Sequence, residues 1–237
     1  MMKNISFYLL TCITLSFAAC NDEVESWNSA TFDYAGRFVV SATCREKPSK
    51  DILIDKGNEI YIYNSAANVA DEIWIDDVLG KIPLKCKFRL NGSPASFSSV
   101  AVAENIKSLY YIYNNVSGKY VKFTSDNKED FPVATAVGQT AAGISEYIRA
   151  SIQEGKILPK LATSPGGNVT DSVYVSFVLQ SETVDFVSEL VPEIDWKTPG
   201  VPEYGWKVKD GTNVPAPDLT ENWVVSGYRY TGYPEDM

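Results

Sequence analysis

The stretch Ser172-Val-Tyr-Val-Ser-Phe-Val-Leu-Gln180 decides the fold class, because its side chains alternate along the chain. Successive side chains of an extended strand point to opposite faces. One face here holds Val173, Val175, Phe177 and Leu179, and the other holds Tyr174, Ser176, Val178 and Gln180. The stretch Ile60-Tyr-Ile-Tyr63 is likewise apolar on both faces, which is unusual for a strand with a solvated outer face.

The same alternation recurs along the chain, between turns rich in Gly, Asn, Asp, Ser and Pro. The other predicted strands are 36–44, 59–63, 72–78, 84–90, 97–103, 109–113, 119–124, 183–189, 204–208 and 222–231. Short strands spaced about 8 to 12 residues apart are typical of antiparallel barrels and sandwiches. We therefore expect an all-β fold in which an antiparallel meander closes into a β-barrel.

One segment follows a helical period instead. Ile144, Tyr147, Ile148 and Ile152 are spaced as on one face of an amphipathic helix, so the pattern predicts a short helix near residues 140–154. The Pro-rich stretches 158–170 and 191–217 are predicted to be loops or sheet edges, because proline cannot donate to a sheet ladder.

Composition excludes several classes of function. The 237 residues have a net charge of −9, which disfavours a nucleic-acid partner. The chain contains no histidine, so histidine-based catalytic triads and histidine-ligated zinc are excluded. The sequence indicates neither a metal site nor a cofactor.

The N-terminus predicts export. A basic start and a short apolar run end at Phe17-Ala-Ala-Cys20, which resembles a lipobox, so residues 1–19 are predicted to be a lipoprotein signal peptide. Cys20 would then carry the lipid that anchors the protein to a membrane. The acidic residues 21–25 resemble the signal that sends Bacteroidetes lipoproteins to the cell surface, although a solvated tether fits them nearly as well. We expect an outer-membrane lipoprotein with a tether over 20–31 and one β-barrel domain over 32–237.

Two cysteines remain in the predicted domain, Cys44 and Cys86. In an exported protein they could form a disulfide, and two separately buried thiols are the equal alternative.

The predicted binding residues come from the aromatic-rich strands. The chain has 14 Tyr and 5 Trp, and such side chains suit a pocket for an apolar molecule with a polar end. Wider small barrels leave room for one such ligand. The predicted lining residues are Tyr61, Tyr63, Trp74, Tyr111, Tyr113, Tyr174, Tyr228 and Tyr230. Arg37 and Arg229 lie in predicted strands and could receive an anionic head group.

Other chemistry is possible without histidine. Asp76 or Asp77 beside Trp74 could serve a carboxylate-dependent glycoside hydrolase, and an aromatic surface could bind glycans. Ser125-Asp-Asn-Lys128 contains S-x-x-K and S-D-N, but the two motifs overlap in one tetrapeptide and indicate a turn rather than a penicillin-binding site.

Three stretches resemble a known family: 33–40 (DYAGRFVV), 62–77 with Ile-Tyr-Asn-Ser and Trp-Ile-Asp-Asp, and 223–233 (WVVSGYRYTGY). Together they resemble a Bacteroidetes lipoprotein family described as lipid-binding putative hydrolases, with a lipocalin-like (calycin) β-barrel. The resemblance implies lipid binding and hydrolysis. No catalytic residue comes with these motifs, so we expect a lipid-like ligand and assign no catalysis.

Overall fold

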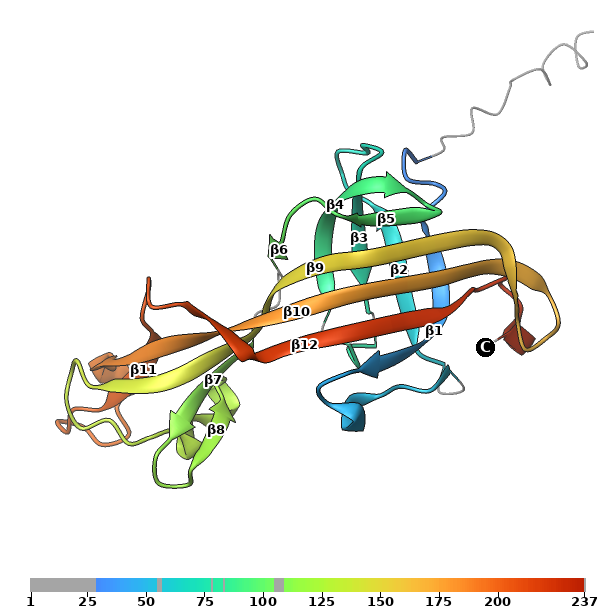
Figure 1. The fold of residues 1–237 in the computed structure, drawn as a ribbon. Helices are drawn as coiled ribbons and strands as arrows, with labels where there is room; N and C mark the ends of the chain where they lie inside the picture. The colour runs from blue at the N-terminus through green and yellow to red at the C-terminus, as the bar shows by residue number, and fades with distance from the viewer. Residues whose placement is uncertain (1–28, 55–56, 78, 83, 105–108, 237) are drawn as a thin grey trace, which may run out of the picture.

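Long β-strands dominate the computed structural model, which describes residues 29–236 apart from 55–56, 78, 83 and 105–108 (Figure 1). The predicted signal peptide, Cys20 and the tether up to residue 28 lie outside the described residues. The strands are β1 Gly36–Cys44, β2 Glu59–Asn64, β3 Glu72–Asp76, β4 Lys85–Ser93, β5 Ser96–Ser99, β6 Ala103–Glu104, β7 Leu109–Asn114, β8 Lys119–Lys122, β9 Thr140–Thr163, β10 Val169–Leu190, β11 Tyr204–Val208 and β12 Val214–Arg229. Short 3₁₀ turns are η1 Pro48–Lys50, η3 Ser125–Asp130, η4 Glu193–Asp195 and η5 Pro234–Asp236.

Eight of these strands close into a ring. The pairing order runs β10-β12-β1-β2-β3-β4-β5-β9, and β9 pairs back with β10. The pairs around the ring are antiparallel, and β1 to β5 form the predicted meander. The expected all-β barrel is therefore confirmed.

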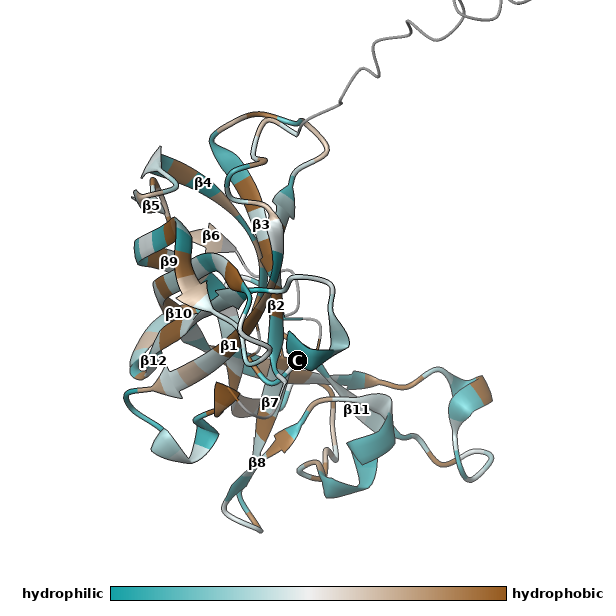
Figure 2. Ribbon diagram, turned by 90° about the vertical axis from the view of Figure 1, so that its right-hand side faces the viewer, coloured by the Kyte–Doolittle hydropathy of each residue, from teal (hydrophilic) through white to brown (hydrophobic). Residues whose placement is uncertain are grey.

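The core of the barrel uses the alternation expected from the sequence, which Figure 2 shows as bands of changing hydropathy along the strands. Inward side chains of all eight ring strands join one buried apolar cluster that includes Phe38, Ile62, Phe88, Phe177 and Trp223. Because these side chains pack against one another, the interior is occupied by the protein itself. The expectation that the barrel leaves room for a ligand is therefore not met within this packed core.

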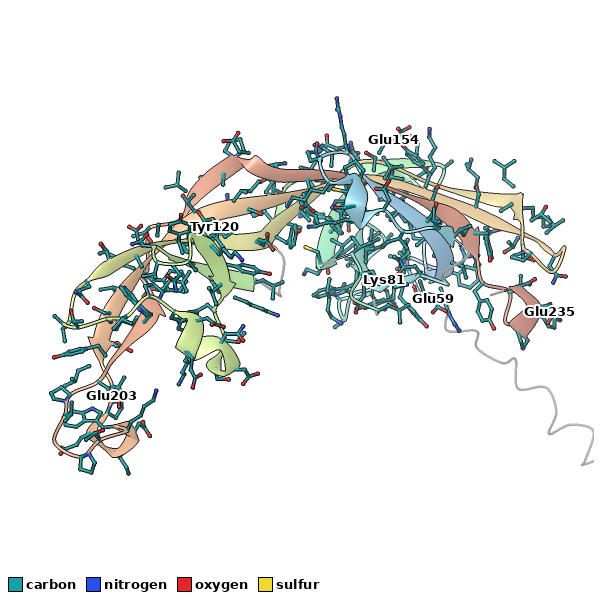
Figure 3. The ribbon with its side chains drawn as sticks, turned by 90° about the horizontal axis from the view of Figure 1, so that it is seen from below. Glu59, Lys81, Tyr120, Glu154, Glu203 and Glu235 are labelled. Atoms are coloured by element: carbon teal, nitrogen blue, oxygen red, sulfur yellow. The ribbon has the colours of Figure 1, made fainter. Side chains whose placement is uncertain are left out.

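β9, β10 and β12 continue beyond the barrel and form an arm (Figure 1). There β7 pairs with β9, β8 pairs with β7, and β11 pairs with β10. The arm has a separate apolar cluster around Ile112, Val184 and Phe186. In Figure 3, Glu203 lies at the end of the arm farthest from Glu59 and Lys81 of the barrel.

The predicted helix over 140–154 is wrong, because these residues belong to strand β9. The pairing of β9 with β10 is irregular between the pairs Ser145–Glu182 and Arg149–Gln180, and Tyr147 adopts a positive φ of 58° there. Extra residues in a bulge turn a spacing of two into a spacing of three. The buried positions Ile144, Tyr147 and Ala150 therefore imitate a helical period within a strand.

Two predicted loop boundaries also differ. The predicted strands 172–180 and 183–189 are parts of one strand, β10, and β9 continues to Thr163. β12 starts at Val214 and contains Pro215 and Pro217, which lie in the stretch predicted to be a loop or a sheet edge. In the arm, β12 is an edge strand paired only with β10 among the described strands, and an edge tolerates proline.

Cys44 and Cys86 are buried as separate thiols in the barrel cluster. Of the two alternatives, the structure contains the separate thiols and does not contain the disulfide. Burial raises the pKa of the Cys44 thiol, which disfavours its reactive thiolate form.

Candidate functional site

A cavity of about 570 Å³ lies at one end of the barrel, which we call the mouth. Such a volume is within the range of about 300 to 1,000 Å³ that is common for small-molecule sites. It lies between the turn before β1, the β4–β5 hairpin and the β9–β10 hairpin. Its walls are formed by Phe32, Asp33, Ser93, Pro94, Ala95, Ile157, Pro159, Asp171 and Arg229.

The mouth combines apolar walls with one ion pair. Phe32, Pro94, Ala95, Ile157 and Pro159 supply carbon surface. Phe32 is 62% exposed, an unusual state for a large apolar side chain unless it contacts something else. The mouth can therefore accept an apolar group without first displacing a strongly bound polar network.

Arg229 is the central polar group of the mouth. Its Nε donates to Oδ2 of Asp171 at 2.9 Å, and its Nη1 donates to the carbonyl of Ala35. Its guanidinium carbon lies 4.9 Å from the ring centre of Phe38, which belongs to the barrel core. Nη2 makes no hydrogen bond to the described residues, and Arg229 is one of the residues that line the cavity, so it can offer donors to a ligand there. The sequence singled out Arg229, and the structure places it in the cavity wall.

The other predicted binding residues do not line the mouth. Tyr61, Tyr63 and Trp74 lie on the outer face of the barrel, because their neighbours Ile60, Ile62 and Ile75 point inward. Tyr63 stacks on Trp74 with ring centres 6.4 Å apart. The sequence correctly predicts that side chains alternate between the two faces of these strands. Which of the two faces points into the core is decided only when the sheet closes.

The remaining predicted residues lie on the outer face of the barrel, against the C-terminal turn, or in the arm. Arg37 is on the outer face, where its Nε donates to Glu59 at 2.6 Å and its guanidinium covers the ring of Tyr230. The hydroxyl of Tyr228 donates to the carbonyl of Asp236 in the C-terminal turn. Tyr174 lies under the ammonium of Lys156, at 5.9 Å.

Tyr111 and Tyr113 belong to β7 of the arm rather than to the barrel. Burial and the nearby carboxylate of Glu146 raise the pKa of Tyr111. The ring of Tyr113 lies 5.1 Å from that of Tyr120. For all nine residues outside the mouth, a role in ligand binding stays a prediction.

A second cavity, of about 990 Å³, lies in the arm. We call it the arm groove. One wall is residues 123–134, from Phe123 through η3, and the other wall is the β10–β11 hairpin. No sequence pattern indicates this groove directly, although the proline content of 191–217 and the aromatic residues Tyr204 and Trp206 are signals that could have pointed to it. The S-x-x-K tetrapeptide is a 3₁₀ turn in its wall, in agreement with the predicted turn.

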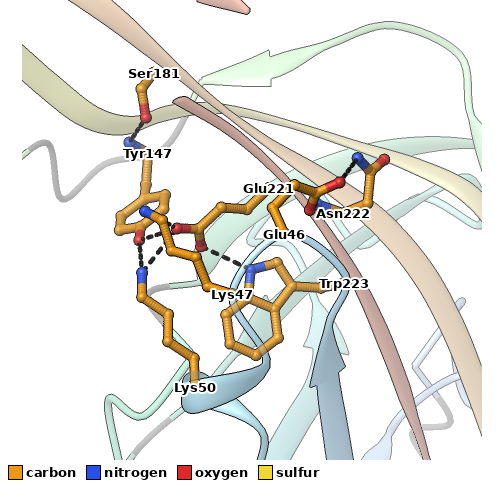
Figure 4. Close-up of polar contacts among 8 residues, drawn as sticks. All are labelled: Glu46, Lys47, Lys50, Tyr147, Ser181, Glu221, Asn222 and Trp223. Carbon is orange, nitrogen blue, oxygen red and sulfur yellow. Dashed lines mark hydrogen bonds and ion pairs between the residues drawn. The ribbon is translucent and has the colours of Figure 1, made fainter. Parts of the chain in front are cut away.

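A buried polar cluster lies where the arm leaves the barrel (Figure 4). The carboxylate of Glu221 is fully buried and is bound by Lys47 at 2.5 Å, Lys50 at 2.8 Å and the hydroxyl of Tyr147 at 2.9 Å. The indole N–H of Trp223 donates to the second carboxylate oxygen of Glu221, Oε2, at 3.1 Å.

Burial alone would raise the pKa of Glu221, but the hydrogen bonds from Lys47, Lys50 and Tyr147 lower it. Burial also raises the pKa of Tyr147, so its hydroxyl stays a donor. Both oxygens of Glu221 have partners, and no residue of this cluster lines the mouth or the arm groove. The cluster therefore fixes the junction of the barrel and the arm.

The carboxylates considered for glycoside hydrolysis have structural partners. Asp76 pairs with Lys85 and accepts the hydroxyl of Tyr63. Asp77 accepts the backbone N–H groups of Leu79 and Ile82 and so fixes a turn. Burial raises the pKa of Asp77 despite these bonds. Neither residue lines the mouth or the arm groove, which disfavours a reaction there.

The described residues contain no group of three or more Cys, Asp and Glu side chains arranged to hold a metal ion. They also contain no helix of the length and apolar character needed to cross a membrane.

Comparison with known proteins identifies one family. A family model described as "lipid-binding putative hydrolase" matches residues 23–234, which is most of the chain. No curated protein sequence matches this chain. The match includes the barrel and the arm together.

Proposed function

Because the chain belongs to the family of lipid-binding putative hydrolases, we propose that it binds an amphipathic, lipid-like molecule at the mouth of its barrel. The observation that supports this site is the mouth cavity itself, with carbon walls and one partly uncommitted guanidinium. The packed interior disfavours a ligand buried deep in the barrel.

The expected binding mode follows from the two kinds of wall. Contact with Phe32, Pro94 and Ile157 would remove hydrocarbon from water, at about 25 cal/mol for each Å² of apolar surface buried. A carboxylate or phosphate head group would accept from the Nη2 donors of Arg229, and charge-assisted bonds of this kind are about twice as strong as neutral ones. Asp171 stays on Nε, so the head group adds to the ion pair rather than replacing it.

We assign the protein binding and no reaction, and we propose that a lipid on Cys20 anchors it at the outer membrane. The lipobox-like Phe17-Ala-Ala-Cys20 and the absence of histidine from the chain support these two parts. Globomycin treatment of expressing cells tests the anchor, because a lipoprotein precursor would then accumulate with its signal peptide uncleaved. Unchanged processing, or a Cys20→Ser variant that still fractionates with the outer membrane, would contradict it.

Filling the mouth is the direct test of the binding site. Ala95→Trp places an indole over the cavity from an exposed hairpin, whereas Ala67→Trp places the same group on an exposed turn outside it. We expect dodecanoic acid to raise the melting temperature of the wild type and of Ala67→Trp, and to leave Ala95→Trp nearly unchanged. Native mass spectrometry of the same three proteins should show the adduct in the first two.

The outcomes separate the two parts of the proposal. Equal binding by Ala95→Trp and wild type would move the ligand away from the mouth. No adduct with dodecanoic acid, a lysophospholipid or a bile acid would remove the lipid-like ligand altogether.

A further inference from the structure

The arm groove differs from the mouth in size and in chemistry. It is about 990 Å³ against about 570 Å³, and it lies between two segments that are far apart in the sequence. Its lining residues include both polar or charged side chains and apolar or aromatic ones. A ligand that suits it must therefore offer both kinds of surface along its length.

Half-buried aromatic rings line the base of the groove. Phe123 and Phe131 stack with ring centres 5.1 Å apart, and the indole N–H of Trp206 donates to the carbonyl of Pro132 at 2.6 Å. This bond links the two walls, so the base is held in place without a ligand. Tyr204 lies beside Trp206 in the hairpin wall. The rings of Tyr204 and Trp206 each combine a flat carbon face with one polar group, whereas Phe123 and Phe131 offer carbon alone.

The rim presents uncommitted donors and acceptors on both walls. Lys128 and Glu129 lie on one wall and Lys197 and Asp195 on the other, and these four side chains make no hydrogen bond or ion pair among the described residues. Lysine only donates and an ionised carboxylate only accepts. Each hydroxyl group of a sugar does both, so a polyhydroxylated ligand can use the whole rim.

The charge of the rim disfavours anionic ligands. Four carboxylates, Glu129, Glu189, Asp195 and Glu203, line the groove against two lysines, Lys128 and Lys197. Glu189 is offset by Lys207, and the whole protein is acidic. A fatty acid or an acidic glycan would meet repulsion here that a neutral molecule would not.

We propose that the arm groove binds a neutral oligosaccharide, with sugar rings on the aromatic base and hydroxyl groups on the charged rim. The volume, at the upper end of the usual range, favours an oligomer over a single sugar. This site is separate from the mouth, so either proposal can fail while the other stands.

The test uses the full-length protein and a panel of neutral hexasaccharides: maltohexaose, cellohexaose, xylohexaose and chitohexaose. Tyr204→Ala removes a ring from the groove, and Tyr120→Ala removes a half-exposed ring from the same arm outside it. Asp195→Asn removes a rim charge without changing the size of the side chain. Calorimetry and tryptophan fluorescence measure binding, because Trp206 lies in the groove.

We expect at least one hexasaccharide to bind, with a loss of about tenfold or more in Tyr204→Ala and less than about twofold in Tyr120→Ala. Asp195→Asn should weaken binding by a smaller factor, and hexagalacturonate should bind more weakly than the neutral sugars. Absence of binding across the panel overturns the proposal. Equal affinity of Tyr204→Ala and wild type, tighter binding of hexagalacturonate, or displacement of the sugar by dodecanoic acid would also overturn it.

Discussion

The two halves of β10 belong to different structures. The first half, which contains Phe177, pairs with β9 and β12 inside a closed ring and contributes to the large barrel cluster. The second half, which contains Phe186, pairs with β9 and β11 in an open sheet with a much smaller cluster. Phe177 and Phe186 are the same residue type, and both are almost completely buried.

This difference shows what ring closure contributes. A closed ring has no free edge strand, and its interior positions support one another from all sides. The arm has free edges and two loops that leave an open groove. The barrel thus provides a rigid frame with a small mouth, whereas the arm presents a larger polar groove.

Truncation of the two phenylalanines should have the largest effects. We expect Phe177→Ala to lower the free energy of unfolding of the whole protein by about 3–5 kcal/mol, because it leaves a cavity in a closely packed core. Phe186→Ala should destabilise the arm by about 3 kcal/mol, since half-buried neighbours can partly fill the space. Urea unfolding and hydrogen exchange measure both.

The location of faster hydrogen exchange distinguishes Phe177→Ala from Phe186→Ala. In Phe186→Ala it should be confined to β7, β8, β11 and the neighbouring parts of β9 and β10. If exchange in β1 to β4 rises equally in both variants, the barrel and the arm unfold as one unit and the comparison is wrong.

Glu221→Gln should have the next largest effect, about 2–3 kcal/mol, because it breaks charge-assisted bonds to Lys47, Lys50 and Tyr147 at a fully buried site. The pKa of Glu221 is lowered by folding, so its contribution is fully present above the unfolded pKa, near 4.5, and is lost as the pH falls through the folded pKa.

The difference in unfolding free energy between wild type and Glu221→Gln should therefore be constant near neutral pH and shrink below about pH 4.5. Urea unfolding at several pH values measures it. Glu154→Gln, at an exposed pair with Lys156, is the matched control and should cost less than about 1 kcal/mol. A difference that grows in acid would contradict the assigned charge state of Glu221.

Two glycines of β9 give the smallest predicted effects. A Cβ on Gly155 would lie 2.1 Å from the ring of Phe97, at the seam where β5 meets β9. A Cβ on Gly143 in the arm would lie 2.2 Å from the ring of Phe186 and 2.5 Å from the carbonyl of Tyr111. Each alanine variant should cost about 1–2 kcal/mol through overpacking.

Hydrogen exchange again separates the two regions. Gly155→Ala should increase exchange along β5 and the mouth, and it should weaken dodecanoic acid binding if the mouth is the site. Gly143→Ala should leave hydrogen exchange along β5 and the mouth unchanged, and it should leave dodecanoic acid binding unchanged. A loss of lipid binding in Gly143→Ala alone would place the ligand in the arm.

The fold class could be predicted because it depends on local alternation. The predicted strand 36–44 coincides with β1, and the predicted strand 204–208 coincides with β11. The predicted helix failed because bulges around Tyr147 changed the spacing of buried residues in β9. Arg229 was singled out because charge is unusual within a strand, whereas the rest of the mouth comes from turns and strand ends without any distinctive pattern.

The sequence by itself determined that this protein is built of antiparallel strands, since a period of two in side-chain polarity is a property of each segment alone. The tertiary structure decided which face of each strand is the inside, that the interior is filled, and where cavities lie. These properties depend on which distant segments pair. Tyr61 and Ile62 have equally apolar surroundings in the sequence, and only closure of the ring turns Ile62 inward and Tyr61 outward.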